Sequence, residues 1–213
     1  MITVKTFIFN PFQQNTYLVY DETNQAIVID AGCLQKSEKE ELKTFIQSNN
    51  LELKLVINTH LHLDHQFGNK FLFDTFGLEP LACVEDEFLL ESVVTQARSF
   101  GLPIDENAKS LGGYIAENEV IKFGNAALTA IHVPGHSPGS LAFYSPEGDG
   151  ILFAGDVLFR GSVGRTDLPK GDYPTLINSI TQKLLTLPDS TVVYCGHGST
   201  TTIGNEKVSN PFL

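Results

Sequence analysis

The feature that most restricts the possible folds of this chain is a run of six residues, His60–His65. It contains three histidines and one aspartate in the order His-x-His-x-Asp-His. The run follows the apolar segment Leu53–Ile57, which predicts a strand, and precedes the apolar-periodic segment Phe67–Phe76. A fold that uses these side chains together must therefore place them where a buried strand ends and a helix begins.

The spacing within this run suits metal binding. In an extended segment, residues two apart point to the same side, so His60 and His62 can bind one ion. Asp64 and His65 lie where the chain turns toward a helix, and can reach a second ion ~3.5–4 Å from the first. Imidazole nitrogens and carboxylate oxygens suit Zn²⁺, and also Fe or Mn. The run therefore predicts a metal site.

Three further candidate ligands follow predicted strands. His136, Asp156 and His197 each lie in a glycine-containing loop directly after an apolar segment; these segments are Leu128–Val133, Ile151–Ala154 and Val192–Cys195. Strand ends commonly converge at one edge of a sheet, where ligands bind. A single histidine after a strand is more often a surface or hydrogen-bonded residue, but the repetition favours metal binding. We expect seven ligands: His60, His62, Asp64, His65, His136, Asp156 and His197.

The remaining pattern predicts an α/β fold in a single domain spanning residues 1–213. Other strands are expected at Ile2–Phe9, Tyr17–Tyr20, Ala26–Ile29 and Leu141–Tyr144. Helices are expected after a capping box formed by Ser37 and Glu40, from Asp86 to Gly101, and from Asp172 to Pro188. The segment 100–118 is the least periodic and is either a loop over a cleft or a surface excursion. His132, inside a strand, is expected to pack or to support a ligand.

The net charge and the cysteine content narrow the possible binding partners and the cellular compartment of this chain. The formal net charge of −11 disfavours a nucleic-acid partner, because such a surface repels phosphates. No apolar run approaches the ~20 residues that span a bilayer, and the first residues do not resemble a signal peptide, so no membrane partner is expected. The three cysteines are odd in number and far apart, which favours a reducing, cytoplasmic location. The oligomeric state is not indicated.

These motifs resemble the metallo-β-lactamase superfamily along nearly the whole chain. The segment Phe159–Asp167 and the ending from Gly196 to Leu213 are similar to the glyoxalase II branch, the hydroxyacylglutathione hydrolases. The resemblance implies a four-layer αββα sandwich with a dinuclear metal site at one edge of the sheets. It also implies that this is the short form of the branch, without the C-terminal helical region that supplies glutathione-binding residues in full-length members.

The resemblance also implies a role for each ligand. His60, His62 and His136 would bind one metal ion, Asp64, His65 and His197 the second, and Asp156 both. Two divalent ions are expected per chain, Zn²⁺ by resemblance and Fe or Mn as alternatives. A bridging hydroxide would attack a small-molecule thioester such as S-lactoylglutathione or a related acyl-glutathione. The catalytic residues would be Asp64 and Asp156, with Asp64 orienting the hydroxide.

Two questions stay open at this stage. Arg160 and Arg165 lie in the loop after Asp156 and, with Tyr173, are candidates to bind the substrate; an ion pair between Arg165 and Asp167 or Asp172 is the structural alternative. The second question is the reaction itself. A persulfide dioxygenase with one Fe(II) ion is the alternative to a thioesterase, and the two differ in metal content and oxygen uptake.

Overall fold

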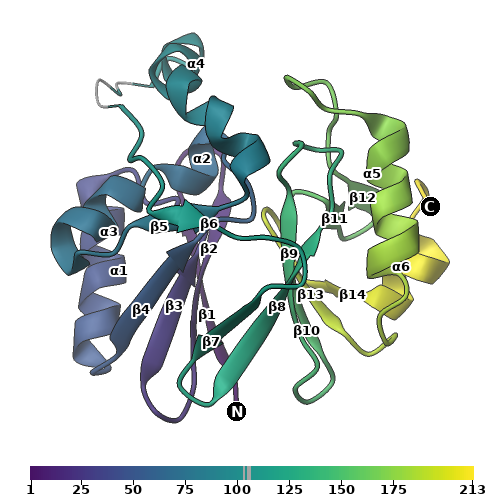
Figure 1. The fold of residues 1–213 in the computed structure, drawn as a ribbon, viewed down its shortest axis with the longest axis horizontal. Helices are drawn as coiled ribbons and strands as arrows, with labels where there is room; N and C mark the ends of the chain where they lie inside the picture. Colours follow the sequence, from purple (N-terminus) through teal and green to yellow (C-terminus); the bar gives the residue numbers. More distant parts are fainter. Residues whose placement is uncertain (103, 105–106) are drawn as a thin grey trace. The chain divides into compact units, whose positions relative to one another are not determined.

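The protein is described by a computed structural model that covers residues 1–102, 104 and 107–213. The chain forms two compact units. The first unit comprises residues 1–114 and 123–126, and the second comprises residues 115–122 and 127–213. Each unit contains one six-stranded sheet with helices packed on it (Figure 1). No helix within the described residues is long and apolar enough to span a bilayer.

The sheet of the first unit has the strand order β1-β2-β3-β4-β5-β6. Its strands are β1 (Thr3–Phe9), β2 (Gln14–Tyr20), β3 (Gln25–Ile29), β4 (Glu52–Ile57), β5 (Pro80–Ala82) and β6 (Gly113–Tyr114). The first three strands pair antiparallel, and β3 to β6 pair parallel. Parallel pairing requires crossover segments, and here these contain α1 (Lys36–Ser48), α2 (Leu63–Gln66), α3 (Asn69–Phe76), a 3₁₀ segment (Val84–Ser92) and α4 (Val93–Ser99).

Helix α1 covers one face of this sheet because its apolar side chains recur at helical spacing. Leu42 and Ile46 are buried in the same cluster as Val28 and Val56 of the strands. The predicted capping box at Ser37 and Glu40 is wrong. The N-cap is Gln35, and the carboxylate of Glu38 accepts hydrogen bonds from the backbone N–H groups of Gln35 (2.9 Å), Leu34 (2.7 Å) and Asn10 (2.8 Å).

The sheet of the second unit has the order β14-β13-β10-β9-β8-β7. Its strands are β7 (Val120–Phe123), β8 (Ala126–His132), β9 (Leu141–Ser145), β10 (Ile151–Gly155), β13 (Val192–Cys195) and β14 (Thr201–Thr202). A separate hairpin pairs β11 (Leu158–Phe159) with β12 (Ser162–Val163). The helical segments are α5 (Tyr173–Ser179), a π-helical turn (Ile180–Leu184) and α6 (Ile203–Ser209). Figure 1 draws α5 in green and α6 in yellow.

The core of the second unit contains the apolar side of its helices. Leu176, Ile180 and Leu184 lie in one buried cluster with Leu152 and Val193 of the strands. Asp172 begins α5 as predicted, since its carboxylate accepts the Thr175 N–H at 2.9 Å. The short helix α6 was not predicted, because its sequence has no extended apolar stripe. Part of the expected segment 100–118 lies outside the described residues, and its remainder contains β6.

Candidate metal centre

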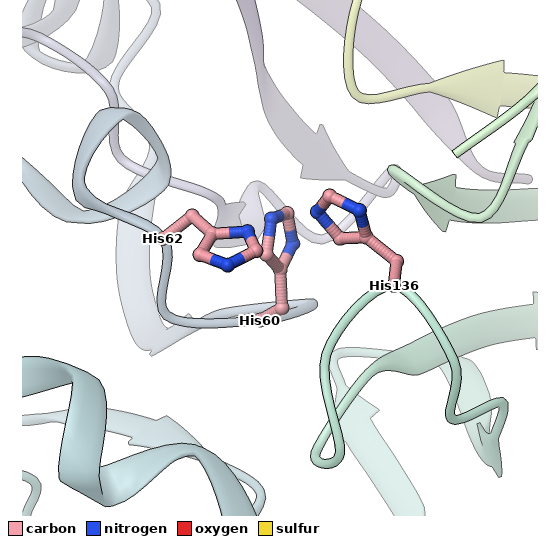
Figure 2. Close-up of side chains that lie close together, drawn as sticks. All are labelled: His60, His62 and His136. Carbon is pink, nitrogen blue, oxygen red and sulfur yellow. The ribbon is translucent and has the colours of Figure 1, made fainter. Parts of the chain in front are cut away.

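Three histidines of the predicted run lie together in the first unit. They follow β4, with His62 at the N-cap of α2, and His60, His62 and His65 are 1%, 6% and 0% exposed. The ring centroids of His60 and His62 are 4.9 Å apart, and those of His60 and His65 are 4.0 Å apart. Figure 2 shows the first two rings projecting from the same segment. Asp64 Oδ2 lies 3.7 Å from His65 Nε2.

A buried carboxylate at the end of β3 fixes two of these rings. Asp30 accepts hydrogen bonds from the Thr59 N–H (2.7 Å), the Thr59 hydroxyl (2.7 Å) and His65 Nδ1 (2.9 Å). His60 Nδ1 lies 3.0 Å from Thr59 Oγ1. Because that hydroxyl gives its hydrogen to Asp30, His60 Nδ1 is the donor in this contact. Nδ1 of both rings is therefore protonated, and Nε2 is the nitrogen through which each ring would bind a metal ion.

The peptide between His60 and His62 is held from two directions. The Leu61 N–H donates to Oδ2 of Asp86 (3.2 Å), a carboxylate that is fully buried in the 3₁₀ segment. The Leu61 carbonyl accepts from Nε2 of Gln66 at 2.6 Å. Both backbone polar groups of Leu61 therefore have side-chain partners, and these contacts restrict the direction in which the flanking imidazoles point.

The second unit brings its own three predicted ligands together. Asp156 follows β10, His136 follows β8 and His197 follows β13. Asp156 Oδ2 lies 3.7 Å from His136 Nε2 and 3.5 Å from His197 Nε2. The side chain of His136 is 2% exposed, and those of Asp156 and His197 are 15% and 27% exposed. One carboxylate oxygen thus faces the Nε2 atoms of two histidines.

Contacts within the second unit hold the loop that carries His136, and Figure 2 shows the His136 side chain projecting from this loop. His136 Nδ1 lies 2.8 Å from the Arg165 carbonyl, so Nδ1 donates and Nε2 is the nitrogen that would bind a metal ion. His132 Nε2 bonds the Pro138 carbonyl at 2.8 Å, which makes His132 a support of this loop. A Cβ on Gly135, whose φ is +135°, would lie 2.3 Å from the backbone of Leu176 in α5. Only glycine therefore permits this close approach.

The same loop, Gly135–Gly139, also matches the Gly-x-Ser-x-Gly pattern of serine hydrolases. Ser137 is fully buried, and its Oγ lies 2.8 Å from that of Ser140. The loop leads into strand β9, whereas a nucleophile elbow leads into a helix. Burial also raises the pKa of the thiols of Cys33, Cys83 and Cys195 to about 12. None of these side chains is therefore placed as a nucleophile.

The hairpin after Asp156 returns close to that residue. A Cβ on Gly164 would lie 1.9 Å from the Asp156 carbonyl oxygen, so the backbone at position 164 occupies the space that a side chain would need. The Gly164 N–H also donates to the Val157 carbonyl at 3.1 Å. The chain path around Asp156 therefore depends on the absence of a side chain at this position.

Of the predicted substrate-binding residues, Arg160 and Arg165 lie in or next to this hairpin, and Tyr173 begins α5. Arg165 forms a bidentate ion pair with Asp167, with Nε–Oδ1 and Nη2–Oδ2 distances of 2.6 and 2.7 Å. Hydrogen bonds from Arg165 lower the pKa of Asp167 to about 2. The ion pair expected as the structural alternative for Arg165 is present, and a role of Arg165 in substrate binding stays a prediction. Arg160 is exposed and Tyr173 is 46% exposed, and their role in substrate binding stays a prediction.

The donor sets in both units fit divalent metal ions. They combine imidazole nitrogens with carboxylate oxygens, which Zn²⁺, Fe and Mn accept. In the first unit, Asp64 Oδ2 lies 3.7 Å from His65 Nε2, and in the second unit Asp156 Oδ2 lies 3.7 Å from His136 Nε2 and 3.5 Å from His197 Nε2. Nδ1 of His60, His65 and His136 has an oxygen partner, as is usual for histidines that bind metal through Nε2.

The residues that hold these ligands through hydrogen bonds were not predicted from the sequence. Asp30 carried a usable signal, because a charged residue directly after the buried strand Ala26–Ile29 is unusual unless it is paired. Thr59, Asp86 and Gln66 carried none, since their contacts depend on how β4, α2 and the 3₁₀ segment meet. The Arg165 carbonyl, which binds His136 Nδ1, carried no signal either, because any residue type has a backbone carbonyl.

Comparisons with known proteins agree with these features. Residues 9–197 match the family model of the metallo-beta-lactamase superfamily. The hydroxyacylglutathione hydrolase GloC of Haemophilus influenzae is 44% identical over 95% of this chain and 93% of its own. Among solved structures, the B3 metallo-beta-lactamase BLEG-1 is 35% identical, with a TM-score of 0.88 over 99% of both chains. TTHA1623, in a di-iron-bound form, is 37% identical, with a TM-score of 0.85 over 99% of this chain and 100% of its own. The α/β class and the metallo-β-lactamase fold are confirmed, and the chain belongs to the metallo-β-lactamase superfamily.

Proposed function

We propose that this chain is a metal-dependent thioesterase that hydrolyses S-lactoylglutathione or a related acyl-glutathione. Membership in the superfamily and similarity to a hydrolase support the broader class, a metal-dependent hydrolase. The observation that carries the proposal is the orientation of the buried histidines. Nδ1 of His60, His65 and His136 lies within hydrogen-bond distance of Thr59 Oγ1, Asp30 and the Arg165 carbonyl respectively, so Nε2 is the nitrogen through which each ring would bind a metal ion.

We assign the seven predicted ligands to two metal ions in a single domain formed by residues 1–213. His60, His62 and His136 would hold one ion, and Asp64, His65 and His197 the other, while Asp156 would contact both. The distances from Asp156 Oδ2 to His136 and His197 within the second unit support a shared position for this carboxylate. Zn²⁺ is the expected metal, and the di-iron form of TTHA1623 supports iron as the alternative.

The chemistry of thioester cleavage suits these side chains. Two divalent ions supply hydroxide at neutral pH and a Lewis acid for the carbonyl oxygen. Asp64 would orient the attacking oxygen. The leaving thiolate needs no strong general acid, because a thiol has a pKa near ~8.5. The three cysteines are buried and form no disulfide within the described residues, which agrees with a reducing compartment, and a cytoplasmic location stays a prediction.

The test is hydrolysis of S-D-lactoylglutathione by protein of known metal content. We expect rapid loss of the thioester with about two metal ions per chain. Full metal content without hydrolysis would overturn the proposed substrate. Oxygen consumption with glutathione persulfide and one iron per chain would instead establish the persulfide dioxygenase reaction.

A variant isolates the shared carboxylate. We expect Asp156→Ala to abolish turnover and to lower the metal content, because its carboxylate faces two ligand histidines. Arg160→Ala, which changes an exposed side chain in the same segment, serves as the control for metal content. If Asp156→Ala kept both its activity and its full metal content, the assignment of Asp156 would be wrong.

A further inference from the structure

We propose that Glu206 is a positioning residue for the second-unit ligands Asp156 and His197. This inference rests on the ligand assignment of the proposed function. Glu206 lies in α6 and its side chain is fully buried. It contacts no candidate ligand directly. Its carboxylate instead connects the segment that follows Asp156 with the segment that follows His197.

The carboxylate of Glu206 accepts four hydrogen bonds. Oε2 accepts from the Gly161 N–H and from Asn210 Nδ2, both at 2.8 Å. Oε1 accepts from Thr201 Oγ1 at 2.5 Å and from Asn205 Nδ2 at 2.7 Å. A carboxylate offers about four lone-pair positions, so these donors satisfy both oxygens. The ionised form is therefore stabilised in a position from which water is excluded.

Two of these four donors belong to the ligand-bearing segments. Gly161 is at the turn between β11 and β12, the hairpin that directly follows Asp156. Thr201 begins β14, which the chain reaches directly after the loop of His197. Asn210 reinforces the first connection, because its Nδ2 also donates to the Ser162 carbonyl at 3.0 Å. Helix α6 thus holds both segments through one buried charge.

Other contacts hold α6 itself in place. Thr202 caps the helix by accepting the Asn205 N–H at 3.1 Å, and Ile203 is fully buried in the apolar core of the unit. The helix therefore has anchors that do not involve Glu206. Removing the carboxylate is expected to free the two ligand-bearing segments more than it loosens the helix.

Three variants test this role with Zn²⁺ binding as the readout, measured by competition with a chelator on the full chain. We expect Glu206→Ala to retain about one Zn²⁺ per chain at a free Zn²⁺ concentration where the unchanged protein holds two. The more weakly bound ion should lose about 10–100-fold in affinity, as is typical when a support of a ligand is removed. The absorption spectrum of the Co²⁺ form should change most for the ion that Asp156 and His197 would both bind, because Asp156 alone is shared with the other ion.

Glu206→Gln is the conservative variant. Its single oxygen can still accept from Gly161 and Asn210, while its amide group can donate to the Thr201 hydroxyl. We expect partial recovery of the second Zn²⁺. Thr202→Ala is the matched control, because it weakens the cap of the same helix and leaves the carboxylate in place. It should lower the melting temperature of the metal-free protein and keep both Zn²⁺ affinities.

The outcomes separate the two proposals. If Glu206→Ala folds and binds two Zn²⁺ with unchanged affinity, or if Thr202→Ala loses Zn²⁺ equally, the inference is wrong. If Glu206→Ala does not fold, equal Zn²⁺ binding by Glu206→Gln and the unchanged protein would overturn it. If the unchanged protein binds two Zn²⁺ but does not hydrolyse the thioester, only the proposed substrate fails. If it cannot bind two, the ligand assignment and this inference fail together.

Discussion

The two groups of candidate ligands are built in different ways. In the first unit, four ligands come from the single run His60–His65, and buried side chains such as Asp30 support them. In the second unit, three ligands come from three loops far apart in the chain. Their supports act largely through the backbone, as with the Arg165 carbonyl and the Gly161 N–H.

Because of this difference, the two groups should respond differently to substitutions. A continuous run places its ligands mainly by local geometry, so the loss of one buried partner affects several neighbours at once. Ligands from separate loops depend on tertiary contacts, so each can be displaced by a change far from it in the sequence. Substitutions in the two units should therefore produce different patterns of metal loss.

The largest effect should come from Asp30→Ala. This change leaves the Thr59 N–H and hydroxyl and His65 Nδ1 without their buried acceptor. We expect a loss of about 3–5 kcal/mol, and thus a melting temperature lower by roughly 6–20 °C, with loss of metal. Thermal unfolding of the metal-free protein and metal analysis would measure both. Normal metal content in a folded variant would show that the run needs no such support.

The second prediction concerns the Thr59 hydroxyl, which connects the His60 ring to Asp30. Thr59→Val keeps the shape of the side chain but removes the hydroxyl between His60 Nδ1 and Asp30. We expect Zn²⁺ affinity to fall about 10–100-fold, as measured by chelator competition. Thr59→Ser keeps the hydroxyl and should bind Zn²⁺ nearly as the unchanged protein does. Equal affinities of the two variants would contradict this role of the hydroxyl.

The third prediction concerns the backbone of the run. Asp86→Ala removes a buried acceptor of the Leu61 N–H. We expect a loss of about 1–3 kcal/mol, or roughly 2–12 °C in melting temperature. Asp86→Asn retains an oxygen for this N–H and should recover part of the stability. An unchanged melting temperature for Asp86→Ala would mean that Gln66, which binds the Leu61 carbonyl, is sufficient.

The fourth prediction uses pH to examine the second unit. Burial raises the pKa of Glu206, but hydrogen bonds from Thr201, Gly161 and the two asparagines outweigh it and hold the pKa below its usual value of 4.5. The stabilising contribution of the carboxylate is therefore present above about pH 4.5 and lost as the pH falls through the lowered pKa. Denaturant unfolding of metal-free protein should show the advantage over Glu206→Gln shrinking as the pH decreases. A constant difference would argue against an ionised Glu206.

The smallest effect should come from Arg165→Ala. Its ion pair with Asp167 is exposed, so we expect no measurable change in melting temperature. Its backbone carbonyl remains, so His136 keeps its partner and metal content should not change. A KM for the thioester raised about tenfold without a change in kcat would identify Arg165 as a substrate-binding residue. An unchanged KM would leave the ion pair as its role.

The strands and the ligand-bearing loops were predictable because their signals are local. Apolar segments such as Ile151–Ala154 end at a glycine and a ligand, and the structure has strands there. Helix detail was less predictable. The expected helix from Asp86 to Gly101 is a 3₁₀ segment followed by α4, and the helix after Asp172 becomes a π-helical turn at Ile180. These geometries depend on packing, which apolar periodicity alone does not specify.

The supports of the site were mostly not predictable because they arise from long-range contacts. Glu206 lies in a mostly polar segment and resembles a solvent-exposed acidic residue, and its burial depends on the hairpin that brings Gly161 to it. Asp86 likewise lies in an acidic stretch that looks solvated. Only a three-dimensional arrangement shows that these carboxylates face donors. Residue type and spacing therefore identify ligands better than they identify what holds them.

Gly164 has a consequence for how mutational data on this protein should be interpreted. Because a Cβ at this position would lie 1.9 Å from the Asp156 carbonyl oxygen, almost every amino-acid substitution there should inactivate the protein. In a deep mutational scan, position 164 would score as severely as a ligand, although it has no functional group. A ranking by intolerance to substitution alone would group this glycine with the catalytic residues. Only the coordinates show that it matters because it has no side chain next to the Asp156 backbone.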